Sequence, residues 1–298
     1  MKNIIFLFFM IFSVSGITAQ EKKWGIEYGA YERVKDGSMK IEDATYLTFF
    51  RVKKIPNDLK DFYNVKEMRL ASCKELKNVD NLCCLDNLER LQIDNCRFGS
   101  IKIDSKLFEK LPRLKTLEIN SSTINTISNK ISNLKALTNL TISNNGEGEN
   151  VFIDYTFLED LPSLEELDLG TNLNICFRNL KNLKNLKRIA LSDSNENSHI
   201  LFEIFGSLTG LEEISLTGAQ IARIPFRKMS KLKKLKITTN KSIENFGSLI
   251  GIETLEELHI GNYIANADSE LILKKLSSVN PKLKIFKTYN QLSEDTDY

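Results

Sequence analysis

The chain has 298 residues, of which 42% are hydrophobic and 27% are charged, and its formal net charge is +2. These are ordinary values for a globular protein. The basic excess is too small for nucleic acid or an acidic lipid surface to be the default partner.

The first 19 residues have the features of a secretory signal peptide. Lys2 supplies a short basic region, an almost unbroken apolar run extends from Ile4 to Val14, and small or polar residues lead to Ala19. This pattern predicts cleavage after Ala19 and export from the cytoplasm. The alternative is an uncleaved membrane anchor, but the run is shorter than the roughly 20 residues that a spanning helix needs. We therefore expect no membrane span after cleavage, and a protein that is secreted, periplasmic or on the cell surface.

Residues 20–43 come before the first of a series of repeated units. They contain Trp24, Tyr28 and Tyr31 with charged residues between them. A stack of repeats has an open apolar end that needs a cover with a polar outer face. We interpret this segment as that N-terminal cap and expect a strand or hairpin; an unstructured linker is the alternative.

One pattern returns along residues 44–263. It is clearest from Leu164 to Asn172, where the spacing is L-x-x-L-x-L-x-x-N. Other copies begin at Leu88, Leu114, Leu137, Leu186, Leu211, Leu232 and Leu255, with looser copies at Ala44, Val65 and Leu283. Successive starts lie 21 to 28 residues apart, about 24 on average.

This spacing and period resemble the leucine-rich-repeat family, and the leader resembles that of secreted bacterial members. The resemblance implies an α/β solenoid, shaped as a horseshoe, with a parallel β-sheet on its concave face and about 10–11 repeats. In each unit the L-x-L portion is the predicted strand. Helical spacing follows between strands, as in Phe157, Leu158 and Leu161. Because the repeats occupy nearly all of the length, no segment is left for a separate catalytic domain.

The eighth residue after each start is the position at which the family takes Asn or Cys to satisfy backbone groups. Asn145, Asn172 and Asn240 match that preference, and Cys73 and Cys96 are acceptable there. The positions that depart from it are Val52, Ala219 and Tyr263. We expect an imperfect ladder at both ends and around Ala219.

The chain has five cysteines, which is an odd number for an exported protein and leaves at least one thiol unpaired within the chain. Cys83 and Cys84 fall on the outer segment of their repeat, and Cys176 lies further along. The chain has no C-x-x-C pair, and both histidines lie far from the cysteines, so we expect buried inert thiols and no metal site.

Residues 264–298 close the array. The spacing of apolar residues from Asp268 to Val279, ahead of Pro281, predicts a capping helix. A last strand is expected at Leu283, Ile285 and Phe286, followed by an acidic tail.

The candidate binding residues are those that point out of the predicted strands, two and four positions after each start. They line the concave face, which is the usual binding surface of a solenoid. The centre is acidic and the C-terminal end gains lysines. The partner-binding candidates are Glu118, Glu166, Asp168, Arg188, Glu213, Lys234, Lys236 and His259.

We expect a binding module without catalytic residues, cofactor or metal. Asp168, Ser215 and His259 share one column, but they lie two repeats apart, about 10 Å, which is too far for a catalytic triad. Glu166 and Asp168 lie within the separation of a glycosidase carboxylate pair, but on an open sheet. A protein ligand is the expected partner. The alternative is a glycan-binding or adhesion protein that uses aromatic residues such as Tyr46 and Phe50.

Overall fold

Every repeat contributes one short strand to the same parallel sheet. The computed structural model describes residues 29–74, 76–96, 105–120, 129–143, 155–170, 177–192, 205–217, 224, 226–238, 246–263 and 267–289. The sheet has 11 strands, and its spatial order from β1 to β11 is the order of the sequence. The strands are β1 (Tyr46–Phe50), β2 (Glu67–Ala71), β3 (Arg90–Asp94), β4 (Thr116–Asn120), β5 (Asn139–Ser143), β6 (Glu166–Asp168), β7 (Arg188–Ser192), β8 (Glu213–Thr217), β9 (Lys234–Thr238), β10 (Glu257–Tyr263) and β11 (Lys284–Tyr289).

Short helical segments return the chain along the outer side. They are α1 (Ala30–Lys35), η1 (Ile41–Asp43), η2 (Leu59–Asp61), η3 (Val79–Cys84), α2 (Ser105–Glu109), η4 (Asn129–Asn133), η5 (Tyr155–Asp160), η6 (Phe177–Asn182), η9 (Phe226–Lys228), η10 (Phe246–Leu249) and α4 (Ala267–Val279), where η marks a 3₁₀ helix. Most of them are 3₁₀ helices of three to six residues, which are narrower than an α-helix.

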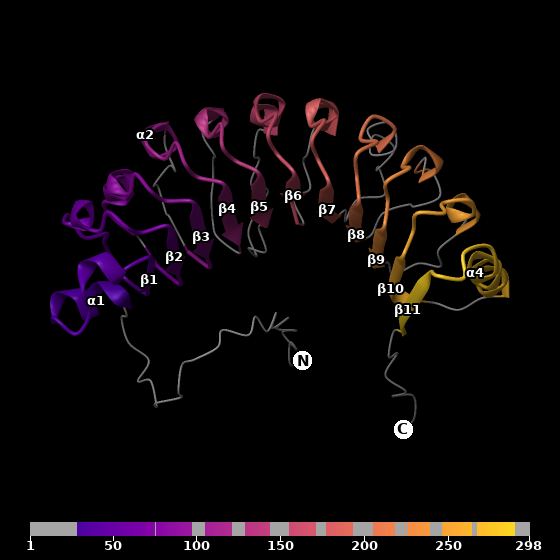
Figure 1. Ribbon diagram of the computed structural model, residues 1–298, viewed down its shortest axis with the longest axis horizontal. Helices are drawn as coiled ribbons and strands as arrows, with labels where there is room; N and C mark the ends of the chain where they lie inside the picture. The colour runs from indigo at the N-terminus through magenta and orange to yellow at the C-terminus, as the bar shows by residue number, and fades with distance from the viewer. Residues whose placement is uncertain are drawn as a thin grey trace, which may run out of the picture.

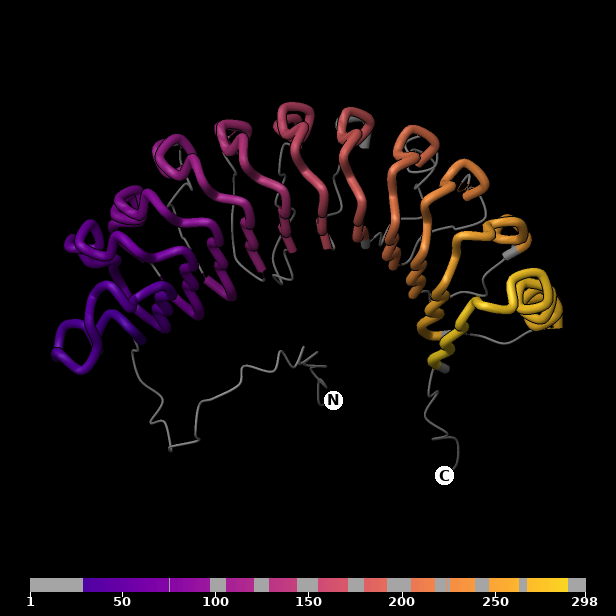
Figure 2. Tube along the Cα trace, viewed as in Figure 1, coloured from indigo at the N-terminus to yellow at the C-terminus, as the bar shows by residue number. Residues whose placement is uncertain are grey.

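The stack is an open arc with the strands on its inner side and the helical segments on its outer side (Figure 1). Neighbouring strands lie about 4.8 Å apart, whereas a helical turn with its side chains is wider than that. The outer layer therefore takes more length than the inner one, and the chain trace curves with the sheet on the concave side (Figure 2). The predicted leucine-rich-repeat solenoid with a concave parallel sheet is confirmed.

The core lies between the sheet and the outer segments. Alternate strand residues are buried, as in β4, where Leu117 and Ile119 point inward and their neighbours are half-buried on the other face. The outer segments contribute large rings, with Phe108, Phe157 and Phe226 all fully buried. Because one face of each strand is buried in the core, the solvent-facing side chains of the strands all lie on the concave surface.

In the second and third repeats, the residue eight positions from the start contacts backbone groups at the turn after the strand. The thiol of Cys73 contacts the carbonyl oxygens of Phe49 at 3.7 Å and Ala71 at 3.5 Å. The backbone N–H of Cys73 donates to the sulfur of Cys96, at 3.4 Å between N and Sγ. These two cysteines satisfy backbone groups as the family pattern implies. The pKa of the Cys96 thiol is raised, mainly by its hydrogen bond with Cys73 and also by burial.

The first repeat departs at this position, because Val52 is buried and its side chain has no hydrogen-bonding atom. The residue just before the position adopts the left-handed conformation in Arg51, Ser72 and Asn95, so the chain turns in the same way in all three repeats. Ala219 lies outside the described residues, as do the asparagines predicted for this position and Cys176.

The prediction of buried thiols is wrong for two of the described cysteines. Cys73 and Cys96 are buried, but Cys83 is half-buried and Cys84 is exposed at the end of η3. Leu82 and Val79 take the inward positions of that 3₁₀ helix, so the residues that follow face the solvent.

The prediction of a strand or hairpin in the N-terminal cap is wrong, because the described part of the cap is helical. After Gly29, α1 places Tyr31 and Val34 against the core, three residues apart on one face. The ring of Tyr31 stacks on Phe62 at a centroid distance of 5.2 Å and meets Phe49 edge-on at 5.8 Å. The predicted leader, Trp24 and Tyr28 lie outside the described residues.

The closing helix is present as α4, with Leu273 and Leu276 buried. The last strand is present as β11, but its register differs by one residue from the frame of Leu283. Leu258 of β10 pairs with Ile285, and His259 pairs with Phe286. A shift of one residue exchanges the two faces of a strand, so Lys287 turns toward α4, where its Nζ donates to Glu270 at 2.7 Å. The predicted acidic tail lies outside the described residues.

A search for membrane spans covered the residues that the structure describes. None of the helices among them is both long and apolar enough to cross a bilayer.

We expect Cys96→Val to lower the free energy of unfolding by about 1–3 kcal/mol, because it leaves the buried N–H of Cys73 without an acceptor. Cys96→Ser keeps an acceptor of similar size and should lose less stability. Urea unfolding followed by circular dichroism measures both variants. Equal stability of the Val and Ser variants would show that this hydrogen bond contributes nothing.

Candidate binding site on the concave face

The concave surface is built from two columns of side chains, two and four positions after each repeat start. The strand registers align these columns, since the register places Glu166 beside Arg188, Arg188 beside Glu213, and Glu213 beside Lys234 on adjacent strands. All eight predicted binding residues lie in the columns, and each is half-buried or exposed. They are Glu118 on β4, Glu166 and Asp168 on β6, Arg188 on β7, Glu213 on β8, Lys234 and Lys236 on β9, and His259 on β10.

Charges of opposite sign follow one another along the first column from β6 to β11. Glu166 forms an ion pair with Arg188, and Nη1 of Arg188 also lies 3.9 Å from Glu213. Lys234 Nζ lies 2.9 Å from Glu257. At a strand spacing of about 4.8 Å, residues in adjacent rows reach each other. We call this run, from Glu166 to Lys284, the inner charge ladder.

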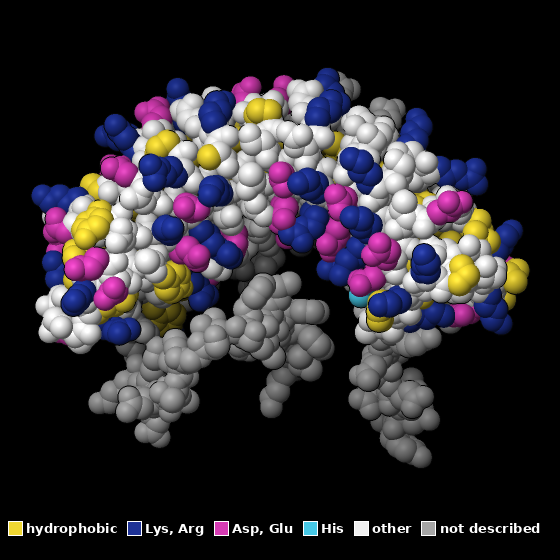
Figure 3. Space-filling view, viewed as in Figure 1, with side chains coloured by type: hydrophobic (Ala, Val, Ile, Leu, Met, Phe, Trp, Pro, Cys, Tyr) yellow, Lys and Arg dark blue, Asp and Glu magenta, His cyan; other side chains and the backbone are white. Residues whose placement is uncertain are grey.

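A second row of alternating charges runs beside it, one position after each repeat start. Its pairs are Lys115 with Glu89 at 2.8 Å, Lys187 with Glu165 at 2.7 Å, and Lys233 with Glu212 at 2.8 Å. The space-filling view shows basic and acidic side chains interspersed over the middle of the arc (Figure 3). These pairs are exposed to solvent, so each contributes little to stability.

Pairing shifts the pKa values of the ladder members. A hydrogen bond from His259, together with one from Lys234, lowers the pKa of Glu257 to about 2. The same contact with Glu257 raises the pKa of Lys234. On β4, burial raises the pKa of Glu118, although Arg90 donates to its carboxylate at 2.6 Å and opposes that shift. The ladder carboxylates of Glu166, Glu213 and Glu257 are thus occupied by cations of the same chain.

Asp168 differs from these residues. Its described partner is the backbone N–H of Gly170, which donates to Oδ1 at 2.9 Å. The register places Thr141 on one side of it and Ala190 on the other, and both side chains are short. Burial raises the pKa of Asp168, and no Lys or Arg of the described segments forms an ion pair with it. It is a half-buried carboxylate among small neighbours at the centre of the concave face.

The sequence prediction missed two residues of the concave columns, because the register of β11 differs from the one that the leucine spacing predicted. Lys284 and Phe286, and not Ile285 and Lys287, extend the two columns. The ring of Phe286 stacks on that of His259, with 4.5 Å between centroids. The alternation of sign along the inner charge ladder was the available signal, because it calls for a cation opposite Glu257.

The aromatic residues of the glycan alternative lie on β1, at the opposite end of the sheet. Tyr46 is 45% exposed, and Phe50 is half-buried beneath the guanidinium of Arg51, whose Cζ lies 5.0 Å from the ring centroid. These rings share a strand, but only Tyr46 presents a large accessible surface.

The residues considered for catalysis are held apart. Asp168, Ser215 and His259 lie on β6, β8 and β10, so one strand separates Asp168 from Ser215 and another separates Ser215 from His259. Glu166 and Asp168 share a strand, but Arg188 pairs with Glu166 and the Gly170 N–H holds Asp168. Within the described part of the chain, no group of three or more His, Cys, Asp or Glu side chains is placed to hold a metal.

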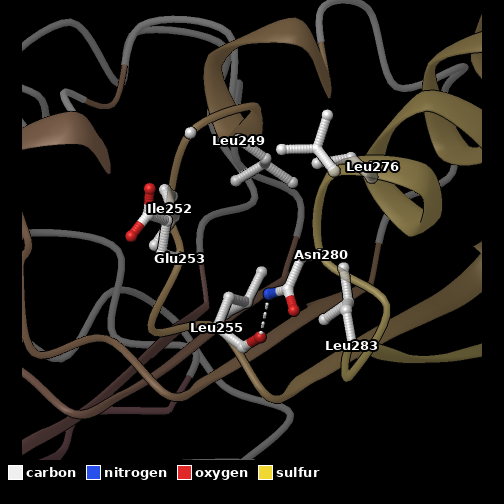
Figure 4. Close-up of a pocket in the computed structure, with 9 residues that line it drawn as sticks. Leu249, Ile252, Glu253, Leu255, Leu276, Asn280 and Leu283 are labelled. Carbon is white, nitrogen blue, oxygen red and sulfur yellow. Dashed lines mark hydrogen bonds between the residues drawn. The ribbon is translucent and has the colours of Figure 1, made fainter.

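A crevice lies between η10 and α4 (Figure 4), and no residue of the two concave columns lines it. Leu249, Ile252 and Leu276 line it, and the side chain of Asn280 donates to the carbonyl of Leu255 at 2.7 Å. Its volume of about 10 Å³ is close to what a single water molecule needs. The concave face therefore remains the candidate site.

Comparison with known proteins agrees with this architecture. The family model described as "Leucine rich repeat" matches residues 86–146, and the matched segment includes strands β3 to β5 of the continuous parallel sheet. This segment matches the leucine-rich-repeat family, and the whole sheet has the leucine-rich-repeat fold. A comparison with curated protein sequences finds no match.

Solved leucine-rich-repeat structures share the fold. An internalin from Listeria monocytogenes is 22% identical, with a TM-score of 0.59 over 85% of this chain and 70% of its own. Internalin C2 from Listeria monocytogenes is 23% identical, with a TM-score of 0.51 over 70% of this chain and 84% of its own. At these identities the likeness extends to the fold alone.

We expect Arg188→Glu to lower the free energy of unfolding by about 1 kcal/mol, because it sets three carboxylates side by side on β6, β7 and β8. Urea unfolding in 0.05 M and 1 M NaCl measures the loss, which should shrink at high salt, where the Debye length is about 3 Å. The neutral variant Arg188→Gln is the control. A loss that is equal for both variants and independent of salt contradicts the ladder.

The raised pKa of Asp168 gives a stability difference that depends on pH. An acid whose pKa is higher in the folded state destabilises that state once it ionises, and the effect disappears below its unfolded pKa of about 3.9. We expect Asp168→Asn to be more stable than the parent at pH 7 and to converge with it near pH 4. Urea unfolding at the two pH values tests this, and a parent that is the more stable protein at pH 7 would refute it.

Proposed function

We propose that this protein is an exported, non-catalytic binding module that recognises a protein partner through the concave face of its solenoid. The predicted leader supports export, and the open sheet supports recognition of an extended surface. Solenoids use such concave surfaces to contact partners over many repeats. The arrangement of side chains narrows the positions that a partner can use.

The environment of the Asp168 carboxylate is the observation that best supports this proposal. Its carboxylate is half-buried, its pKa is raised by burial, and its sequence neighbour Glu166 is already paired with Arg188. An acidic group that is desolvated without a compensating cation lowers stability. Such groups are concentrated at functional sites, where a partner supplies what the free protein lacks.

A cationic side chain is the group that Asp168 would accept. The short side chains of Thr141 and Ala190 leave room on both sides for a lysine or arginine to enter. In the complex that cation would give Asp168 the kind of partner that Glu166, Glu213 and Glu257 already have. Charge complementarity of this kind contributes orientation and selectivity as well as affinity.

The remaining predicted residues take a second role in this proposal. Glu166, Arg188, Glu213 and Lys234 hold the shape of the surface through the inner charge ladder. A partner can contact them, but their charges are largely neutralised by one another. We therefore place the selective contacts at Asp168 and at the ends of the ladder.

A capture experiment tests the proposal. The chain from Gln20 onward, its Asp168→Lys variant and its Glu159→Lys variant would be immobilised and exposed to extracellular and envelope extract. The third variant is the matched control, because Glu159 is exposed on the outer segment η5 of the same repeat. We expect proteins that the parent and the Glu159 variant retain and the Asp168 variant loses by at least tenfold, as quantified by mass spectrometry.

The other outcomes separate the alternatives. Equal retention by all three chains would refute a concave-centre site. Retention of glycan alone, abolished by Tyr46→Ala, would replace protein recognition with the adhesion function, since Tyr46 is the exposed aromatic residue of β1.

A further inference from the structure

The C-terminal end of the concave face combines an exposed aromatic ring with lysines. We call Lys236, His259, Phe286 and Lys284 the C-terminal corner. Strand registers place Lys236 beside His259 and His259 beside Phe286, in one row across β9, β10 and β11. Lys284 lies in the adjacent row, beside Glu257.

Phe286 is exposed in a way that the fold does not require. It is 46% exposed, whereas Ile285, the next residue on the strand, is half-buried against the core. Its ring lies nearly parallel to that of His259, with an interplanar angle of 16°. The two rings are stacked on each other, so His259 covers one side of the Phe286 ring and the exposed area lies on the rest of that ring. Exposed aromatic rings with adjacent basic groups are typical of the positions that dominate binding energy at protein interfaces.

Among the described residues around these two rings, one cation forms no ion pair. A single oxygen of Glu257 accepts from both Lys234 and His259, each at 2.9 Å. Glu213 is shared by Arg188 and Lys236. Lys284 is exposed at the last strand, and within the described residues no acidic group forms an ion pair with it. Within the part of the chain that the structure describes, the inner charge ladder therefore ends on a lysine that forms no ion pair and lies next to an apolar ring.

We propose that the C-terminal corner binds an acidic segment of the partner protein, with a carboxylate on Lys284 and an adjoining aromatic or aliphatic side chain on the rings of Phe286 and His259. This inference rests on the proposed function and names the partner chemistry for one end of the same surface. Glu213 and Glu257 lie within or beside the lysine rows and repel a continuous polyanion. A short acidic peptide segment is thus favoured over nucleic acid.

Phage display of random 12-residue peptides provides the probe. Peptides would be selected on the immobilised chain from Gln20 onward, in 0.05 M NaCl. Enriched sequences would be synthesised with a fluorescent label, and their affinities measured by fluorescence anisotropy. We expect enriched peptides that carry at least two acidic residues next to an aromatic or aliphatic residue.

Four variants assign the binding to the corner. Phe286→Ala should weaken the selected peptides at least tenfold, and Phe286→Leu should weaken them less, because it keeps an apolar contact. Lys284→Glu should weaken them about fivefold or more and flatten the salt dependence of binding. Tyr46→Ala is the matched control, because it removes an aromatic ring of similar exposure at the opposite end of the concave face, and it should leave affinity unchanged. Circular dichroism and urea unfolding would establish that each variant is folded.

The results distinguish this inference from the proposed function. Peptides that bind the folded Phe286→Ala and Lys284→Glu variants as tightly as the parent would overturn the corner while leaving peptide recognition in place. Selection of basic peptides whose binding is lost only in an Asp168 variant would also overturn the corner while leaving peptide recognition in place. Failure of the parent to enrich any peptide over the bare support would overturn the corner and protein recognition together.

Discussion

The spacing of parallel strands is the constraint on which the rest of the molecule depends. A single repeat cannot bury its leucines alone, so each unit stacks on its neighbours, and the backbone ladder fixes their separation at about 4.8 Å. That distance is shorter than the width of the outer turns, which bends the stack and makes the sheet concave (Figure 2). It also brings side chains of equivalent positions within ion-pair range. The inner charge ladder, from Glu166 through Arg188 to Glu213, is a consequence of the same geometry that buries Leu167 and Ile189.

This constraint changes how the charged residues of the concave face are interpreted. A column with many charges is an attractive binding surface when each side chain is considered alone. Once adjacent repeats are stacked, most of these charges neutralise one another and hold the repeats in register. What distinguishes a position is then the lack of compensation. Asp168 lacks a described cation at the centre, and the ladder ends on Lys284 beside the exposed ring of Phe286. The two positions differ in charge, so a partner that uses both needs a basic group and an acidic group.

Much of the candidate site was predictable. Alternation along each L-x-L segment placed all eight candidates, from Glu118 to His259, on the concave face. The closing helix also followed from its spacing. The errors in secondary structure and strand register occur at the two ends of the array, whereas the error for Cys83 and Cys84 lies within it, on η3. The cap around Tyr31 is a helix, because a residue that covers an apolar end needs only one inward face, and α1 supplies it as well as a strand would. At β11 the leucine frame failed by one residue, since Lys287 pairs with Glu270 of α4 and Ile285 faces the core. At each end of the array, contacts with the capping segment override the leucine pattern. In the middle of the array, stacking between adjacent repeats enforces that pattern.

The sequence by itself determined the repeating unit, its strands and the faces of those strands, because burial of leucine depends on a local period that each unit carries. The tertiary structure decided which charges are engaged. Ion pairs join residues about 22 positions apart, as in Glu166 with Arg188, and their partners depend on the register between strands. It also decided that Lys284 and Phe286, and not their neighbours, reach the concave surface. Register is a property of two strands together, and therefore the composition of the site appears only when the repeats are stacked.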